Sequence, residues 1–466
     1  MRKIAALLLC ALLMLGTGCT LLDFVPSSTS SVALDTENIS SSVSAPADTS
    51  SGQSITNTTS NPQNTSSKNP QQPQSITGTT SSNTSNTTST ESNQVTINPY
   101  AENTCYNTIS AEQQRLYRIM LSAIKNVTVE WIWLGNCSDD YLADIAVAYR
   151  AVTYDYPELF WVPYTYVVNK EKGNPGVRLA FELTNAGSNK KYLVEPYEVD
   201  QKQAELNKKT QNIIDEVEKN AKTPYQKVLY LHDLLINNIT YSHGRDEGGK
   251  TVYDDMAYTV YGALVNRDAV CEGYAKAMSY LCKKMGIECI LVTGVSKDQG
   301  HMWNLVELEG KWYHIDVTWD DAEKIIEYPL HAYFCLTDEQ IKADHTIDPD
   351  VWQVSKADKE QGMKGYNFGL PECTATKYNY FEQKNYYLGD DLAAAGKLIE
   401  DICRQEYCIE LKFKTPEQLA QYEALDKEGR EIYILALSKN VDTNVPNWKF
   451  KVKQYALIKD CLYIEW

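Results

Sequence analysis

The sequence is poor in basic residues, and this limits the partners that it can bind. Its 44 Lys and Arg stand against 61 Asp and Glu, which gives a formal net charge of −17. A nucleic-acid partner is disfavoured, because Lys and Arg are needed to bind its phosphates. The same balance provides no polybasic anchor for an anionic membrane surface. The apolar run near the N-terminus, Ile4–Leu15, is too short for a comfortable transmembrane helix.

Metal-binding signatures are also missing. The chain has 12 cysteines, but no two of them form a C-x-x-C pair, so a structural zinc site is not expected. No group of acidic residues has the spacing of a calcium loop. The sequence therefore predicts no metal and no other cofactor. The cysteines that follow Cys19 lack the close, regular spacing of a disulfide framework, and their pairing stays open.

Residues 1–19 have the features of a targeting segment. Arg2 and Lys3 are followed by an apolar run, and small residues precede Cys19. This ending resembles the lipobox of bacterial lipoproteins, in which Cys19 would carry the lipid, although Gly16 stands where a Leu is usual. The alternative is an ordinary secretory signal that is cut nearby. Both interpretations predict export, and the first places the protein on the outer side of the cell membrane.

Aromatic residues are absent from a long stretch after the targeting segment. The chain as a whole has 32 Tyr, 9 Trp and 8 Phe, but residues 25–98 contain none of these and are dominated by Ser, Thr, Asn, Gln and Pro. Such a segment cannot bury enough apolar area to fold. We therefore interpret residues 20–98 as a disordered linker that lets a folded part stand away from a membrane anchor.

The remainder of the chain is predicted to be of the α+β class, in three parts. Residues 99–222 are predicted to be mostly helical, with helices over 110–126 and 198–221 and short strands over 164–168 and 177–183. Residues 223–364 are predicted to form the central core. In residues 365–466 a small α+β module is expected, whose strands include the apolar run 431–437.

The central core contains the residues that can carry chemistry. Cys271 begins a predicted helix, and a helix N-terminus favours the thiolate form of a cysteine. His301 and Asp316 lie on the two strands of a predicted hairpin that turns at Glu309–Gly310. Both are at comparable distances from the turn, so an antiparallel pair makes them cross-strand neighbours. Cys271 alone would be an ordinary buried thiol, but the three together have the arrangement of nucleophilic acyl transfer.

Three segments of this core resemble a known family. VCEGYAKAMSYLCKKMGI, GHMWNLVELEGKWYHIDVTWDD and HAYFCLTDEQIKADHT look like the transglutaminase-like core of bacterial surface proteins, which shares the papain-like cysteine-protease fold. The resemblance covers about Thr223–Thr346. It implies a Cys-bearing helix packed on an antiparallel sheet, with Cys271 as nucleophile, His301 as base and Asp316 as its orienting carboxylate. Met302 departs from the family, which usually has Ala there.

Other residues receive smaller roles. The resemblance implies that Tyr261 can lie on the oxyanion side. Trp303, Trp312 and Trp319 are expected in the core and in the wall of the substrate groove. Structural roles are expected for the remaining candidates, namely His232 and His314 as satisfied histidines, Asp344 and His345 in a loop, Asn304 as a polar group at a strand edge or as one that orients its neighbours, and Cys282 and Cys289 as buried thiols.

Two functions follow from this interpretation. The first is an exported, lipid-anchored cysteine acyl-transfer enzyme that forms a thioester and passes the acyl group to an amine, which crosslinks, or to water, which hydrolyses. Its substrates would be proteins or peptides at the cell surface, including cell-wall peptides. The second is a catalytically silent module of the same fold that binds or assembles surface partners. A third, a cell-wall-binding protein with marginal hydrolase activity, is also open.

Overall fold

A computed structural model describes most of the chain after residue 103. The described residues are 33–34, 104–137, 141–162, 166–169, 174–178, 193–244, 253–321, 328–349, 366, 368–403, 408–439 and 454–465. The targeting segment, the lipidation residue Cys19 and the linker apart from β1 (Ala33–Leu34) lie outside them. The predictions made for those segments stay predictions. Among the described residues, no helix combines the length and the apolar character needed to cross a bilayer.

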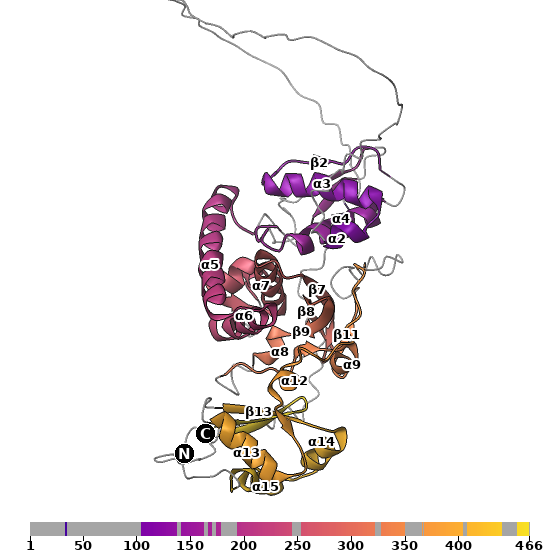
Figure 1. Ribbon diagram of the computed structural model, residues 1–466. Coiled ribbons are helices and arrows are strands. Elements are labelled where there is room, and N and C mark those ends of the chain that lie inside the picture. The colour runs from indigo at the N-terminus through magenta and orange to yellow at the C-terminus, as the bar shows by residue number, and fades with distance from the viewer. Residues whose placement is uncertain are drawn as a thin grey trace, which may run out of the picture. The chain divides into compact units, whose positions relative to one another are not determined.

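The N-terminal region contains the predicted helices and a small sheet. The helices are α2 (Thr104–Thr108), α3 (Ala111–Lys125) and α4 (Tyr141–Asp155), and α3 and α4 pack against each other (Figure 1). A capping box between Ser110 and Gln113 begins α3, which satisfies two helix-end N–H groups. The strands β2 (Ile132–Trp133), β3 (Val167–Asn169) and β4 (Gly176–Arg178) form a sheet in the order β1-β3-β4-β2.

Two long helices lead into the core. They are α5 (Val199–Asn220), preceded by the 3₁₀ turn η1 (Pro196–Glu198), and α6 (Pro224–Asn238). A second capping box, between Thr223 and Gln226, begins α6, and Pro224 occupies its first position, where the missing N–H costs nothing. The helix predicted over 198–221 is confirmed as α5, which begins without a side-chain cap, and α6 begins at a local start signal.

A helix packed on a five-stranded sheet forms the centre of the fold. The helix is α7 (Cys271–Lys284), and the sheet has the order β10-β9-β8-β7-β11. Its strands are β7 (Cys289–Ser296), β8 (Gln299–Leu308), β9 (Lys311–Ile315), β10 (Phe334–Leu336) and β11 (His345–Ile347), and all neighbours are antiparallel. The hairpin turn at Glu309–Gly310 is confirmed, with φ of 53° and 75°, as a type I′ turn requires.

Short elements connect these parts. They are β5 (Thr240–Tyr241), η2 (Asp255–Tyr258), the π-helical turn η3 (Gly262–Asn266), β6 (Asp268–Ala269), α8 (Val317–Asp320), α9 (Asp338–Ile341) and α12 (Tyr380–Lys384). β5 and β6 pair in parallel just before α7. Apolar side chains from residues 105 to 381 join one continuous core, so the N-terminal helices and the central sheet are packed together.

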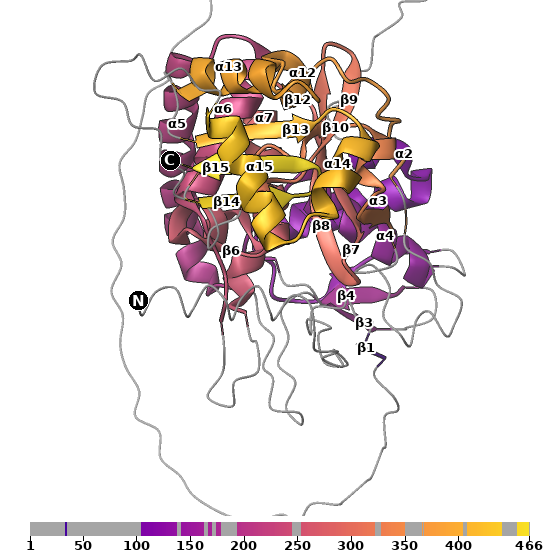
Figure 2. The same ribbon diagram turned by 90° about the horizontal axis from the view of Figure 1, so that it is seen from below.

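The C-terminal part is a second sheet with its own apolar core. Its strands are β12 (Tyr387–Leu388), β13 (Cys408–Phe413), β14 (Gln454–Ile458) and β15 (Cys461–Glu465), in the order β12-β13-β15-β14. Its helices are α13 (Leu392–Cys403), α14 (Pro416–Glu423) and α15 (Lys427–Lys439). Figure 2 shows β13, β15 and β14 side by side, with α15 lying across them.

One predicted strand of this module is wrong. Residues 431–437 belong to α15 and not to a strand. Ile434 and Leu437 are buried whereas Ile432 is 59% exposed, which is the three-residue spacing of a helix face. The carboxylate of Asp426 accepts the N–H of Gly429 at 2.7 Å and caps the helix start. A short apolar run does not distinguish a strand from a helix by itself.

Candidate active site

Cys271 lies at the first position of α7, where the helix lacks a side-chain cap. The preceding residue, Val270, has extended backbone angles and forms no capping hydrogen bond, so the first N–H groups of α7 have no partner from the cap. Gly273 lets this helix start approach η2 closely, because a Cβ there would lie 2.4 Å from the carbonyl oxygen of Ala257. The Cys271 side chain is 8% exposed.

The hairpin brings His301 and Asp316 together. His301 lies on β8, and Asp316 follows the last residue of β9 and caps α8. Their side chains form a hydrogen bond, with 2.6 Å between His301 Nε2 and Asp316 Oδ2. Since Asn304 pairs with Ile315, Asp316 falls opposite residue 303, and the pair is diagonal across the strands rather than directly opposite. The predicted contact is present with this shift of register.

Four groups hold the carboxylate of Asp316. Its Oδ1 accepts the N–H groups of Thr318 and Trp319 at 3.0 and 3.1 Å, which fixes the carboxylate at the start of α8. Its Oδ2 is shared by His301 and by His345, whose Nε2 lies 2.9 Å away. Asp316 is 1% exposed. The carboxylate of Asp316 is therefore shielded from water and held in place, and it accepts hydrogen bonds from two imidazoles.

Charge interactions shift the pKa values of both partners. Burial disfavours the charged form of His301, but the Asp316 carboxylate outweighs it and, with a smaller contribution from a hydrogen bond to Cys271, raises the pKa of His301 to about 10. Burial acts on Asp316 in the opposite direction, yet His301 and His345 hold its pKa far below the ordinary 3.8. Since Nε2 of His301 is occupied by Asp316, Nδ1 is the ring nitrogen left for the Cys271 thiol.

His345 is the part of the site that the sequence did not predict. It was expected to fix a loop, but its two ring nitrogens bridge Asp316 and Asp344, with 2.7 Å between Nδ1 and Asp344 Oδ1. The side chain of Lys459, from the C-terminal module, lies 3.2 Å from Asp344. A continuous series of polar contacts thus joins this module to the Asp316 carboxylate. His345 lies in the segment HAYFCLTDEQIKADHT, which resembles the family. Its position beside Asp316, however, depends on the pairing of β11 with β7.

The aromatic residues around the site differ from the expected ones. Tyr261 donates its hydroxyl to Glu205 at 2.6 Å and so faces α5. Trp303 is 1% exposed and stacks on the His301 ring at 5.9 Å, so it supports the imidazole from inside the core. Burial raises the pKa of Tyr241, and the charge interaction with Cys271 is the next largest cause.

Trp319 is the half-buried aromatic beside the site. Its ring centroid lies 6.2 Å from that of His301 and 6.0 Å from that of His345. The ammonium of Lys297 lies 3.6 Å from the Trp319 ring centroid, within the range of a cation–π contact. Trp319 is thus the accessible aromatic surface next to the His301 imidazole.

Asn304 has a different position from the predicted strand edge. It lies on β8, which is a central strand, and is 1% exposed. Its Nδ2 donates to the carbonyl oxygen of Ala275 at 3.0 Å. This hydrogen bond joins the strand that carries His301 to the helix that carries Cys271, so Asn304 positions the two elements.

Of the other predicted side chains, His314 and Cys282 are buried as expected, whereas Cys289 is only partly buried. Nδ1 of His314 accepts the indole N–H of Trp303 at 2.9 Å, and the thiol of Cys282 lies in the core. None of the nine cysteines whose side chains the structure describes forms a disulfide.

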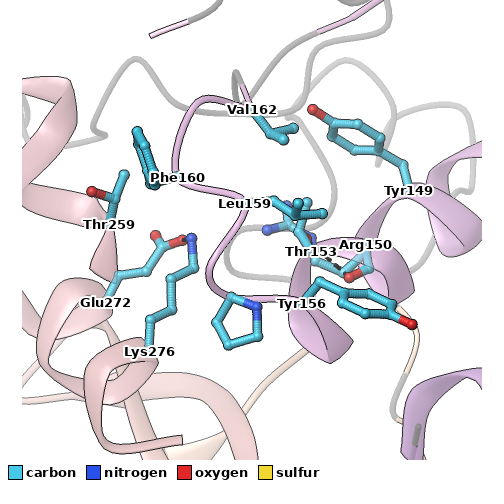
Figure 3. Close-up of a pocket in the computed structure, with 11 residues that line it drawn as sticks. Tyr149, Arg150, Thr153, Tyr156, Leu159, Phe160, Val162, Thr259, Glu272 and Lys276 are labelled. Carbon is cyan, nitrogen blue, oxygen red and sulfur yellow. Dashed lines mark hydrogen bonds and ion pairs between the residues drawn. The ribbon is translucent and has the colours of Figure 1, made fainter. Parts of the chain in front are cut away.

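A small cavity lies on the other side of the α7 start. Glu272 and Lys276 point into it from α7, and Arg150, Leu159 and Phe160 line it from the N-terminal region (Figure 3). Glu272 and Lys276 form an ion pair of 2.7 Å. The cavity offers about 20 Å³ to the centre of a water molecule, which is room for about one or two waters. It is too small for a peptide, and Cys271 does not line it.

A thiol at a helix start, beside an imidazole that a buried carboxylate orients, is the arrangement that nucleophilic acyl transfer requires. Comparison of the sequence with protein families adds a match over this region. Residues 211–317 match the family model described as the Transglutaminase-like superfamily, and this range includes Cys271, His301 and Asp316. The chain therefore contains a transglutaminase-like domain.

Curated relatives are similar over part of their length. Kyphoscoliosis peptidase of Mus musculus is 29% identical over 121 residues, which are 22% of this chain and 18% of the relative. Kyphoscoliosis peptidase of Homo sapiens is 25% identical over 162 residues, which are 31% and 24% of the two chains. This chain thus spans less than a quarter of the length of either relative.

Among solved structures, a TGase matches with a TM-score of 0.22 and 15% identity, over 33% of this chain and 44% of that one. A TM-score this low adds no support for fold or function.

Proposed function

We propose that the protein is a cysteine acyl-transfer enzyme of the transglutaminase-like type. The observation that carries the proposal is the hydrogen-bonded pair of His301 and Asp316, with 2.6 Å between His301 Nε2 and Asp316 Oδ2, beside Cys271 at the start of α7. Three side chains from three elements meet here in the order that a nucleophile, its base and an orienting group require. The transglutaminase-like match over residues 211–317 supports the same chemistry.

The reaction begins at the thiol. Nδ1 of His301 takes the thiol proton, and the sulfur of Cys271 attacks the carbonyl carbon of an amide. The oxyanion that forms accepts hydrogen bonds from the uncapped N–H groups at the α7 start, beginning with that of Cys271. His301 then returns the proton to the leaving nitrogen, the C–N bond breaks, and a thioester remains on Cys271.

A second acceptor completes the reaction. An amine that attacks the thioester gives a crosslink, and water gives hydrolysis. Asp316 accepts a hydrogen bond from the Nε2–H of His301 throughout and stabilises the charged imidazole. We place the substrates outside the cell, as surface proteins or cell-wall peptides, because the targeting segment at residues 1–19 predicts export and lipid attachment at Cys19.

A silent binding module is the second candidate function, and one observation favours it. The Cys271 side chain is 8% exposed and His301 6%, which limits the access of a substrate to the thiol. The two functions differ in thiol reactivity, since a catalytic thiolate is accessible and a structural thiol is not.

Alkylation of the full-length chain separates the two. We expect iodoacetamide to modify Cys271 rapidly at pH 6, and we expect His301→Ala to slow this modification by about 100-fold, because the ion pair is lost. Cys271→Ser should abolish both amine incorporation into Gln-containing peptides and peptide hydrolysis. Slow alkylation that is indifferent to His301→Ala would favour the silent module, and full activity of Cys271→Ser would end the enzyme proposal.

A further inference from the structure

A second cluster of histidines and carboxylates lies outside the triad. His232 and Asp233 are on α6, and His331 precedes β10. His232 is 0% and His331 7% exposed. None of the three residues takes part in the proposed acyl transfer.

The inner atoms of this cluster converge on one point. Asp233 Oδ1 lies 2.9 Å from His232 Nδ1 and 3.1 Å from His331 Nε2. The three ligand atoms are all within 4.8 Å of one another. Ligand atoms around a tetrahedral Zn²⁺ are about 3.3 Å apart, since each bond measures about 2.0–2.1 Å. The cluster is therefore close to the size of a metal site.

The outer nitrogens of the two imidazoles point to carboxylates. His232 Nε2 lies 3.1 Å from Asp320 Oδ2, and His331 Nδ1 lies 3.0 Å from Glu410 Oε2. Metal-bound histidines almost always donate the other ring N–H in this way, which fixes the tautomer and directs a lone pair to the ion. Both His232 and His331 have an outer nitrogen that faces a carboxylate and an inner nitrogen that faces Asp233 Oδ1.

A neighbouring cluster shows what the opposite tautomer looks like. His314, Asp338 and Cys373 also lie close together. However, Trp303 donates its indole N–H to His314 Nδ1 at 2.9 Å, so His314 Nε2 carries the proton and faces Asp338 Oδ1 at 2.8 Å. Neither nitrogen of His314 then has a lone pair for a cation. The comparison singles out the His232 cluster.

The carboxylates around the two imidazoles also favour a cation at this site. Three carboxylates, those of Asp233, Asp320 and Glu410, surround the two imidazoles. A divalent cation would replace the protons that these carboxylates otherwise stabilise on the two imidazoles. Lys412 is on the same strand as Glu410, but its ammonium pairs with Asp460 at 2.9 Å.

We propose that His232 Nδ1, Asp233 Oδ1 and His331 Nε2 bind one divalent transition-metal ion, with Zn²⁺ the best match to two imidazoles and one carboxylate. Water completes the coordination on the side of Asp233, whose side chain is 36% exposed. The ion braces α6 against the segment before β10. Through Asp320 it also supports α8, the helix that Asp316 caps, and through Glu410 it supports β13.

This site departs from the sequence-based expectation of no metal. That expectation rested on the missing C-x-x-C pairs. Short sequence motifs cannot reveal ligands such as Asp233 and His331, which are 98 residues apart. The adjacent pair His232–Asp233 has no recognised metal-binding spacing by itself.

Metal analysis of the full-length chain, purified without chelators and dialysed against Zn²⁺, tests the proposal. We expect about one tightly held Zn²⁺ per chain and a higher unfolding temperature after Zn²⁺ is added to chelator-treated protein. His331→Gln should lose the ion, and His314→Gln, a buried histidine of the other tautomer, should keep it. Cys271→Ser should also keep it, which distinguishes this site from metal bound at the triad.

Cobalt provides a readout that does not depend on how a variant folds. The wild-type chain loaded with Co²⁺ should show visible d–d absorption that one equivalent of Zn²⁺ removes. Absence of both the absorption and the bound Zn²⁺ in the wild-type chain would overturn the proposal and leave a hydrogen-bonded ion network. Loss of the metal in Cys271→Ser together with its retention in His331→Gln would overturn it as well.

Discussion

At the scale of single residues, the unusual feature of the site is that one carboxylate oxygen accepts from two imidazoles. Oδ2 of Asp316 lies 2.6 Å from His301 and 2.9 Å from His345. His345 does not touch the thiol, so its effect on the chemistry passes through Asp316. It is a positioning residue, because it determines where the carboxylate that orients His301 lies.

Substitution of His345 should therefore lower reactivity without abolishing it. We expect His345→Ala to reduce the alkylation rate of Cys271 and kcat by about 10- to 100-fold, the usual cost of losing an outer-shell partner, with KM nearly unchanged. His345→Gln is the matched control, since its amide N–H can still donate to Asp316, and it should retain most of the rate. If Cys271 in the His345→Ala variant were alkylated at the wild-type rate over the whole pH range, this role would be contradicted.

At the scale of elements, β11 brings His345 to the site, and a glycine makes room for that strand. Ile347 of β11 pairs with Gly294 of β7. A Cβ at Gly294 would lie 2.1 Å from the carbonyl oxygen of Thr346 and 2.7 Å from the ring of Trp303. Contacts this short cannot be accommodated without moving β11 or the tryptophan that stacks on His301.

Gly294→Ala should displace β11 and lower both stability and reactivity. We expect a loss of about 1–3 kcal/mol in the free energy of unfolding, the usual cost of overpacking, together with slower alkylation of Cys271. Urea denaturation and alkylation rates check the two effects. Gly389→Ala serves as the control, because nothing lies within 4 Å of a Cβ there. Equal stability of both variants would show that β11 is not held against Gly294.

The same elements show what the sequence could and could not predict. The starts of α3 and α6 and the hairpin turn were predictable because Ser110, Thr223 and Glu309–Gly310 are local signals. The contact between His301 and Asp316 followed from the hairpin. The inward position of His345 was not predictable, since it depends on β11 pairing with a strand about 50 residues earlier in the chain.

At the scale of the whole molecule, the C-terminal module contacts the core through ionic groups. Glu410 accepts the backbone N–H of His331 at 3.0 Å, and Lys459 pairs with Asp344 at 3.2 Å. Asp344 in turn holds His345. The charge states of buried groups in the core therefore affect the stability of the folded chain as a unit.

The expected pH dependence of the free energy of unfolding follows from His301 and Asp344. The pKa of His301 is raised from 6.5 to about 10, so its stabilising charge is fully present below pH 6.5 and is lost as the pH rises through 10. The pKa of Asp344 is lowered from 3.8 to about 2, where burial is outweighed by His345 and Tyr333, so its contribution is lost as the pH falls through 2. We therefore expect maximal stability between about pH 4 and 6.5.

Urea denaturation at pH 5.5 and 9 measures the alkaline part of this profile. The wild-type chain should lose on the order of a few kcal/mol between the two values, since each pKa unit corresponds to about 1.4 kcal/mol. His301→Gln should be less stable than wild type at pH 5.5 and should lose less of its stability by pH 9, because the glutamine does not titrate. The difference between the two chains isolates His301 from the tyrosines and cysteines that ionise in the same range. If both chains weakened equally between pH 5.5 and 9, the ion pair of His301 with Asp316 would contribute nothing to folding.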